Sequence, residues 1–303
     1  MKEKNFLERP LHPSFPAITG EIFVFGIILL LTAISRFYDL ETRAMSHDES
    51  LHTYFSYLLY RGDGYQHTPM MHGPLQFHLL ALSYFIFGVS DFTARIPSVL
   101  FSIATIWMLW HWRRYLGKAG TLIAAAFMLI SPFMLFYGRY VRNETFSGFA
   151  GLLMLFAVLR YLDSGNKRYL YWLTLSLLIN FTSKETAFIY AAQMLLFLAV
   201  YFIWKLVSKP WKDDSSRNTF ITIVAVAILL IGATLGAGIL GKEDVSAPGM
   251  ETAMPANPLA ETTPSAGGGI NIWVMVLAAL VLVALGLALY FLVQGLGWRG
   301  IRA

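Results

Sequence analysis

The chain has 303 residues, of which 56% are hydrophobic and only 14% are charged, whereas soluble domains carry about 25% charged residues. With apolar runs of roughly 20 residues, this composition excludes a soluble globular protein and predicts an all-α polytopic membrane protein. The net charge of +5 does not indicate nucleic acid as a partner, because basic residues of membrane proteins collect on cytoplasmic loops. The chain has no Cys, which excludes disulfides and thiolate metal sites.

In chain order, a polar tail at 1–21 precedes the first expected membrane span at 22–38. We interpret this span as a retained anchor, because it is long for a signal peptide and no small-residue cleavage site follows it. About eight transmembrane helices are expected in all, and a flexible outer loop rich in Gly, Pro, Ala and Thr, at 241–269, precedes the last one. The further expected spans are 96–112, 119–138, 146–162, 169–183, 186–204, 219–240 and 271–293.

The apolar segment 75–89 decides the topology. It covers roughly 22 Å as a helix, which is short of the ~30 Å hydrocarbon core, and it contains Gln76 and His78. We therefore expect a juxtamembrane helix along the interface, within an outer loop at 39–95. With a cytoplasmic N-terminus, most Lys and Arg residues then lie inside, as the positive-inside rule requires.

These assignments predict a multi-pass plasma-membrane protein in three parts. The N-terminal tail is cytoplasmic. A membrane module at 22–205 carries the chemistry on its outer face, and further membrane helices occupy 206–303. If 75–89 crossed the bilayer instead, the basic pair Arg113 and Arg114 would lie outside, which the positive-inside rule disfavours.

Four polar clusters fall on the outer side in this topology, at 46–52, 67–74, 138–145 and 183–186. Charged groups at membrane depth are costly unless they face a polar cavity or pair with one another. Because the clusters recur at successive outer turns, we predict that they form one shared polar site.

The first two clusters contain acids and histidines. Asp48 and Glu49 are either solvated loop acids or part of this site. Asp48 and His52 lie one helical turn apart, a spacing that permits carboxylate base chemistry or a divalent cation. A divalent cation is a possible cofactor only, because the spacing matches no tight ligand pattern, and histidines near an interface more often serve as hydrogen-bonding groups. The candidate substrate-binding residues are His47, His52, His67, His72 and Tyr54.

The other two clusters contain cations. Arg139 and Arg142 are three residues apart and would share a helix face. Two guanidiniums there would either bind a phosphate or extend to lipid headgroups, and the same alternatives hold for Lys184. Glu144 either pairs with these cations or acts in the site itself.

The order of short motifs adds a resemblance to a known family. The motifs are His47-Asp-Glu49, His67-Thr-Pro, His72-Gly-Pro, the segment 87–98 (FGVSDFTARIPS), Arg113-Arg-Tyr-Leu-Gly117, Ser131-Pro and Tyr137-Gly-Arg-Tyr140. Over roughly 20–205 the chain resembles the C-type membrane glycosyltransferases, of the protein O-mannosyltransferase and aminoarabinose-transferase kind. Among these it is most similar to the prokaryotic flippase-activity-associated family.

The resemblance implies two juxtamembrane helices in the first outer loop and a polyprenyl-phosphate sugar donor in the membrane. It implies an acid near the transferred sugar at Asp48, with Glu49 beside it, and a second acidic position at Glu144. It places the donor phosphate near Lys184, to which we add Arg139 and Arg142. Such enzymes usually have more spans and often a soluble outer domain, so we expect either a compact member or an incomplete chain.

The predicted function is therefore transfer of a hexose or pentose from a polyprenyl-phosphate donor to an acceptor lipid, glycan or protein, by inverting displacement. The sequence has no Gly-rich phosphate loop, which favours a lipid donor over a nucleotide sugar. One alternative is a lipid-linked sugar flippase or transporter, which predicts mid-membrane charges and broken helices in repeated halves. Another is a non-catalytic scaffold that binds polyprenyl lipids.

Overall fold

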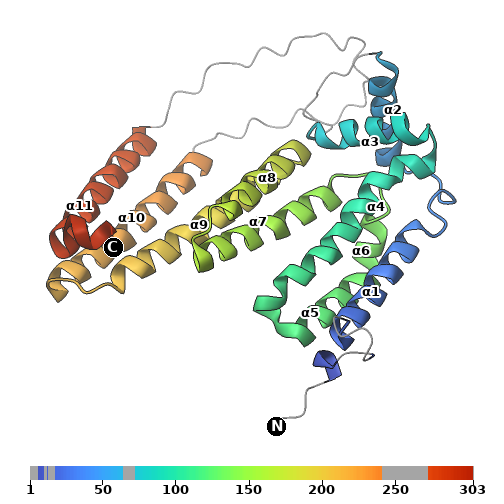
Figure 1. Ribbon diagram of the computed structural model, residues 1–303. Coiled ribbons are helices and arrows are strands. Elements are labelled where there is room, and N and C mark those ends of the chain that lie inside the picture. The colour runs from blue at the N-terminus through green and yellow to red at the C-terminus, as the bar shows by residue number, and fades with distance from the viewer. Residues whose placement is uncertain (1–5, 10–11, 13–17, 64–71, 241–271, 303) are drawn as a thin grey trace. The chain divides into compact units, whose positions relative to one another are not determined.

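The computed structural model describes residues 6–9, 12, 18–63, 72–240 and 272–302 (Figure 1). Every secondary-structure element in these residues is a helix, which confirms the predicted all-α membrane class. The predicted site residue His67 and the predicted loop 241–269 lie outside the described residues. The elements are η1 (Phe6–Glu8), α1 (Gly20–Phe37), α2 (His47–Arg61), α3 (Leu75–Phe87), α4 (Asp91–Met108), η3 (Leu109–Trp112), α5 (Arg113–Ile130), α6 (Pro132–Tyr137), α7 (Glu144–Ser164), α8 (Arg168–Ser183), α9 (Ala187–Val207), α10 (Asp214–Leu240) and α11 (Ile272–Arg302).

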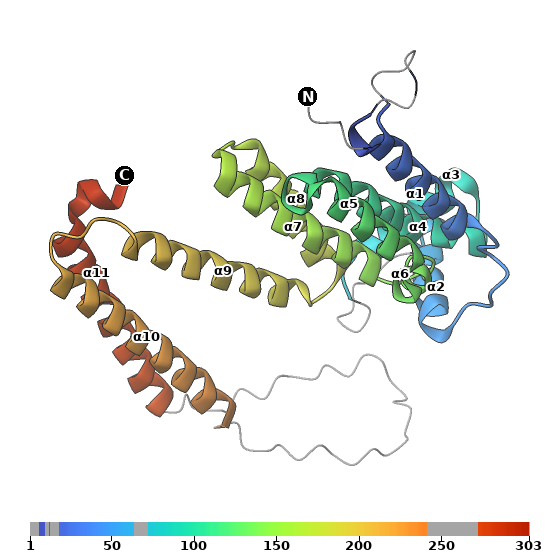
Figure 2. The ribbon, with the colours of Figure 1, turned by 90° about the horizontal axis from the view of Figure 1, so that it is seen from below.

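The chain divides into two compact units, Met1–Leu196 and Phe197–Ala303. In the first unit, α4 packs against both α1 and α7, α5 packs against α1, and α8 packs against α7 (Figure 2). Buried side chains from these helices form the core, including Phe25 of α1, Ile106 of α4 and Leu153 of α7. Close van der Waals packing of these side chains holds the bundle in one arrangement.

Helices α2 and α3 lie at the end of the first unit where α1 ends and α4 begins (Figure 1). Local sequence determines where α2 and α4 start. Ser46 and Glu49 form a capping box at α2, and Ser90 and Thr93 form one at α4, so that otherwise unpaired N–H groups of the first turns are satisfied. Helix α3 has 13 residues and covers about 20 Å, which is too short to cross a ~30 Å core; its interfacial position stays a prediction.

Within the described residues, six helices are long and apolar enough to cross a membrane. The sequence-based count was higher for two reasons. The continuous helical run Asp91–Ile130 is one of the six, although it comprises α4, η3 and α5, contains two predicted spans and has a break at Gly117, whose φ is 70°. Helix α8 has 16 residues and covers only about 24 Å.

One predicted span is wrong in detail. The range 119–138 is not a single helix, because α5 ends at Ile130 and α6 begins at Pro132. Ser131 has a ψ of 122° and its side chain accepts a hydrogen bond from the N–H of Met134. A residue before proline avoids the helical region, so the chain turns here and brings 138–143 to the end of the unit that carries α2.

The second unit contains α10 and α11, which run in opposite directions side by side (Figure 1). Leu206, Phe220, Ala288 and Leu292 form its buried cluster. The indole of Trp211 donates a hydrogen bond to the carbonyl of Leu206 at 3.1 Å, which fixes the turn after α9.

Candidate functional site

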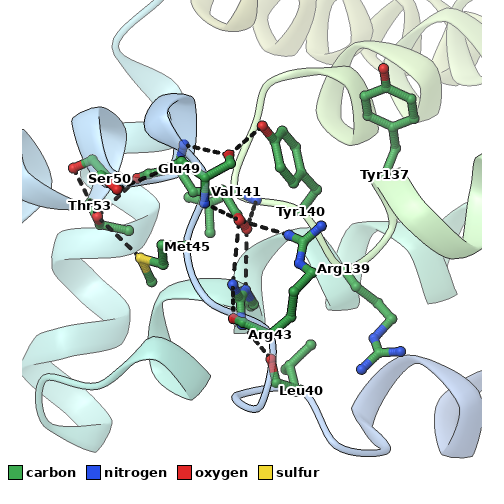
Figure 3. A network of polar contacts seen from close by, with 12 residues as sticks. Leu40, Arg43, Met45, Glu49, Ser50, Thr53, Tyr137, Arg139, Tyr140 and Val141 are labelled. Atoms are coloured by element: carbon green, nitrogen blue, oxygen red, sulfur yellow. Dashed lines mark hydrogen bonds and ion pairs between the residues drawn. The ribbon is translucent and has the colours of Figure 1, made fainter.

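Glu49 is the centre of a buried polar network at the start of α2 (Figure 3). Its carboxylate is fully buried and accepts hydrogen bonds from Arg43 at 2.7 Å, from Arg95 at 3.2 and 3.3 Å and from the backbone N–H of Val141 at 3.1 Å. The backbone N–H of Ser46 donates a further bond at 3.2 Å. Glu49 therefore joins α2, α4 and the turn 138–143, and it has no free oxygen facing a substrate.

Asp48, the neighbouring acid, belongs to a different group of charges. One of its carboxylate oxygens pairs with Nη1 of Arg142. Nε of Arg142 lies 3.5 Å from Oε2 of Glu144, and Oε1 of Glu144 accepts a hydrogen bond from Nζ of Lys184 at 2.8 Å. These four residues, which we call the charge chain, alternate in sign and come from α2, the turn 138–143, α7 and the end of α8.

The charge chain is accessible from outside the protein. The Asp48 side chain is 44% exposed, whereas Arg142, Glu144 and Lys184 are 24%, 24% and 20% exposed. Two carboxylates and two cations leave no net charge, so an incoming anion must compete with the acids for the cations. Residues from three of the four predicted polar clusters thus meet at one place.

His52 lies in the second turn of α2 and is buried. Its Nδ1 is 2.7 Å from the carbonyl oxygen of Asp48, and its ring stacks on Phe77 with 5.4 Å between ring centroids. Burial lowers the pKa of His52 below its ordinary value of 6.5, so the ring is neutral at pH 7. Since the carbonyl is an acceptor, Nδ1 carries the proton in this arrangement. Nε2 is then an acceptor, and it is buried without a partner in the described part of the chain.

His72 and Glu185 form a second pair near the charge chain. Nδ1 of His72 lies 2.8 Å from Oε2 of Glu185, and the N–H of Gly73 donates to the carbonyl of Ser183 at 3.0 Å. Burial raises the pKa of Glu185, but hydrogen bonds from its own backbone N–H and from His72 outweigh burial, so that the pKa is lowered. Glu185 was not among the candidate site residues predicted from the sequence, although it directly follows Lys184 within the fourth polar cluster.

The remaining predicted residues do not join the charge chain. The segment 138–143 is a turn between α6 and α7, so Arg139 and Arg142 do not share a helix face as predicted. Arg139 instead donates to the carbonyls of Tyr38 and Asp39 at 2.6 and 2.9 Å. Tyr54 lines a separate surface hollow, and the first residue of α2, His47, is exposed.

An apolar groove begins at Glu144 and follows α7. Its volume is about 370 Å³, within the range of roughly 300–1,000 Å³ that small-molecule sites have. Glu144, Gly148, Gly151 and Leu155 line it and recur at helical spacing on one face of α7. A Cβ added at Gly148 would meet open space. The groove is therefore open at this position because Gly148 has no side chain to fill it. Apart from Glu144, the other lining residues are mainly apolar or aromatic, and they are Thr105, Met128, Phe133, Met134, Tyr137, Gly138, Thr145, Phe149, Leu152 and Tyr190.

The possible divalent cation stays a prediction. Within the described ranges, no group of three or more His, Asp or Glu side chains is arranged to hold a metal ion. His67, one of the histidines considered for such a role, lies outside these ranges.

The fold and the site define a polytopic membrane protein with a charged site at one end of its first unit. An apolar groove begins at this site and follows α7. Residues 71–235 match the family described as dolichyl-phosphate-mannose-protein mannosyltransferase. Because the match covers more than half of the 303 residues, the chain belongs to this family, and the predicted membership of the C-type membrane glycosyltransferases is confirmed. No curated protein and no solved structure matches the chain. The match includes Glu144 and Lys184 but begins after α2.

Proposed function

We propose that this glycosyltransferase moves a sugar from a polyprenyl-phosphate donor to an acceptor hydroxyl on the outer face of the plasma membrane. The acceptor is a lipid, a glycan or a protein. The observation that supports the proposal is the charge chain at the head of the apolar groove on α7. A polyprenyl-phosphate sugar has an apolar tail, then a phosphate, then the sugar, and the groove, the cations and Asp48 offer complementary surfaces in that order.

Arg142 and Lys184 bind the donor phosphate in this proposal. They pair with Asp48 and Glu144 in the structure. The phosphate is the leaving group, and its negative charge grows as its bond to the sugar breaks, so nearby cations stabilise the transition state more than the bound donor. Glu144 contacts both cations and keeps them at the head of the groove.

Asp48 is the proposed general base. When Arg142 turns to the phosphate, Asp48 loses its ion-pair partner and can accept a proton. The acceptor hydroxyl gives this proton to Asp48 while its oxygen bonds to the anomeric carbon. The bond from that carbon to the phosphate oxygen breaks, and polyprenyl phosphate leaves. One such displacement inverts the anomeric centre, because no carboxylate attacks the sugar.

The other predicted residues have supporting roles. Glu49 positions the first turn of α2, because all its hydrogen bonds go to the protein. His72 lies next to the charge chain, where we propose that it contacts sugar or acceptor, whereas the buried His52 bonds to the carbonyl of Asp48 and supports the start of α2. We assign no step to a divalent cation.

The test is a transfer assay with purified protein reconstituted in vesicles. Polyprenyl-phosphate mannose with a radioactive sugar is the probe, because the family description names a dolichyl-phosphate mannose donor, and a membrane extract from the source organism supplies acceptors. We expect Asp48→Asn to reduce incorporation of label at least about 100-fold, the usual contribution of a general base. Asp63→Asn, an exposed acid just beyond α2, is the matched control and should leave incorporation unchanged.

Equal incorporation by Asp48→Asn and wild-type protein would remove the base role. A flippase would instead carry the labelled donor across the vesicle membrane without releasing the sugar from its lipid. A lipid-binding scaffold would show neither transfer nor any effect of Asp48→Asn.

A further inference from the structure

A basic cavity, separate from the neutral charge chain, lies where the loop after α1 meets α4 and α6. It is lined by Leu40, Arg43, Arg95, Leu135, Phe136 and Arg139 and has a volume of about 130 Å³. This volume is well below the roughly 300 Å³ at which small-molecule sites begin. The cavity is therefore suited to a single phosphate-sized group rather than to a sugar nucleotide or an intact glycan.

The cavity carries excess positive charge. Within the described residues, Glu49 pairs with two of its three arginines, Arg43 and Arg95, and Arg139 bonds to backbone carbonyls rather than to a carboxylate. Arg95 is only 1% exposed and is held by Glu49 and by the carbonyls of Leu40 and Arg43 at 2.6 and 3.0 Å. A fixed positive charge in a partly buried cavity attracts an anion more strongly than it would in water.

Within the described residues, two of the arginines keep hydrogen-bond donors for a ligand. Arg139 makes both its bonds, to the carbonyls of Tyr38 and Asp39, through Nη2. Arg43 likewise uses Nη2 for Glu49, and its guanidinium lies 5.1 Å from the ring centroids of both Phe136 and Tyr140. Arginine also donates from Nε and Nη1, and these edges match the oxygens of a phosphate.

The rim of the cavity is apolar and indicates where the phosphate comes from. Phe136 lines the cavity and is 48% exposed, and Tyr38, whose carbonyl accepts a hydrogen bond from the cavity residue Arg139, is 73% exposed. In a membrane protein such side chains face acyl chains or the headgroup region. We propose that Arg43 and Arg139, beside the fixed positive charge of Arg95, bind the headgroup phosphate of an anionic membrane phospholipid, whose acyl chains lie against this aromatic rim.

The bound lipid would connect three segments of the first unit. Arg43 is on the loop that leads into α2, Arg95 is on α4 and Arg139 follows α6. A phosphate bridging them would steady the same Glu49 network that positions Asp48. The inference rests on the membrane setting and on these arginines, and it does not depend on the proposed sugar transfer.

Lipid binding by the full-length protein tests this inference. Delipidated protein in detergent is titrated with phosphatidylglycerol or phosphatidylcholine, and bound lipid is counted by native mass spectrometry. We expect one saturable phosphatidylglycerol site, weakened at least about tenfold in the Arg43→Gln/Arg139→Gln double variant, since removing a charge-assisted hydrogen bond reduces affinity by that order. The control Arg61→Gln/Arg217→Gln removes the same charge at two surface ion pairs and should bind like wild type.

Equal phosphatidylglycerol binding by the double variant and wild type would overturn the site. Displacement of the lipid by millimolar inorganic phosphate would overturn the lipid source and assign the cavity to free phosphate. If the double variant does not fold, Arg139→Lys decides, because it keeps the charge but loses the planar fork; unweakened binding would then contradict the inference. Since the readout is bound lipid, a failed transfer assay leaves this result standing.

Discussion

Two adjacent carboxylates in the first turn of α2 have opposite surroundings. Successive residues of a helix point about 100° apart, so Asp48 turns toward Arg142 while Glu49 turns into the protein. Asp48 is accessible to an acceptor, whereas Glu49 has every oxygen bonded by arginines and backbone N–H groups. Exposure thus separates a candidate base from a residue that positions it.

Replacing Glu49 should destabilise the first unit. Glu49→Gln keeps the side-chain size but leaves the buried Arg95 without a carboxylate, and breaking a buried ion pair costs about 3–5 kcal/mol. Thermal unfolding of the purified protein in detergent measures the change. Glu41→Gln, an exposed acid on the preceding loop, should shift stability by less than about 0.5 kcal/mol. Equal melting temperatures for Glu49→Gln and wild type would contradict the positioning role.

His52 makes stability depend on pH. Because burial lowers its pKa in the folded state, the unfolded chain binds its proton first as the pH falls. Above about pH 6.5 both states are neutral and there is no effect, and below it the free energy of unfolding decreases until the folded pKa is reached. Melting temperatures between pH 5 and pH 8 should fall more steeply on the acid side for wild type than for His52→Gln. Parallel curves would show that His52 does not contribute.

At the scale of one element, α7 combines the charged and the apolar parts of the site. Its first residue, Glu144, pairs with Lys184, and the same face continues through Gly148 to Leu155 along the groove. The helical repeat aligns these residues in a row. One helix can therefore present a phosphate-binding end and a tail-binding face to the same lipid.

A side chain introduced at Gly148 should block the groove. Gly148→Leu projects into open space, so we expect folding to persist while the KM for a long-chain polyprenyl-phosphate donor rises about tenfold. A short-chain donor cut to a single isoprene unit should be affected less, because Gly148 lies about 6 Å along the helix from Glu144 and little of that tail passes this turn. Gly26→Leu on α1, where an added Cβ also meets nothing, is the matched control. An unchanged ratio between long- and short-chain donors would show that the tail lies elsewhere.

At the scale of the whole molecule, the orientation in the membrane decides which face carries the chemistry. The charge chain, Glu49 and the basic cavity all lie at the end of the first unit where α2 begins. The distribution of Lys and Arg predicts that this end is outside.

Accessibility of single cysteines tests the orientation, since the chain has no Cys of its own. Ser50→Cys on α2 and Ser164→Cys at the end of α7 are matched exposed substitutions. In intact cells a membrane-impermeant maleimide should label Ser50→Cys, and it should label Ser164→Cys only after the membrane is opened. The reverse pattern would place the site on the cytoplasmic face.

Much of the fold follows from the sequence alone. Long apolar runs with few charges specify membrane helices, because unpaired backbone polar groups and charges are too costly in lipid. Local capping signals such as Ser46 with Glu49 predict where a helix starts, and a motif order spread over most of the chain identifies the glycosyltransferase family. The gathering of the polar clusters follows from the same cost of isolated charge. All of these depend on residues close together in the chain or on composition.

Only the tertiary structure decided which polar residues share a pocket. Asp48, Arg142, Glu144 and Lys184 come together because α2, α7 and α8 converge at one end of the first unit. Arg139 lies elsewhere because Ser131 and Pro132 end the helix that was expected to carry it, and the following turn sends its side chain away from Arg142. Side-chain direction at a turn depends on packing between segments distant in sequence, and spacing along the chain does not contain that information.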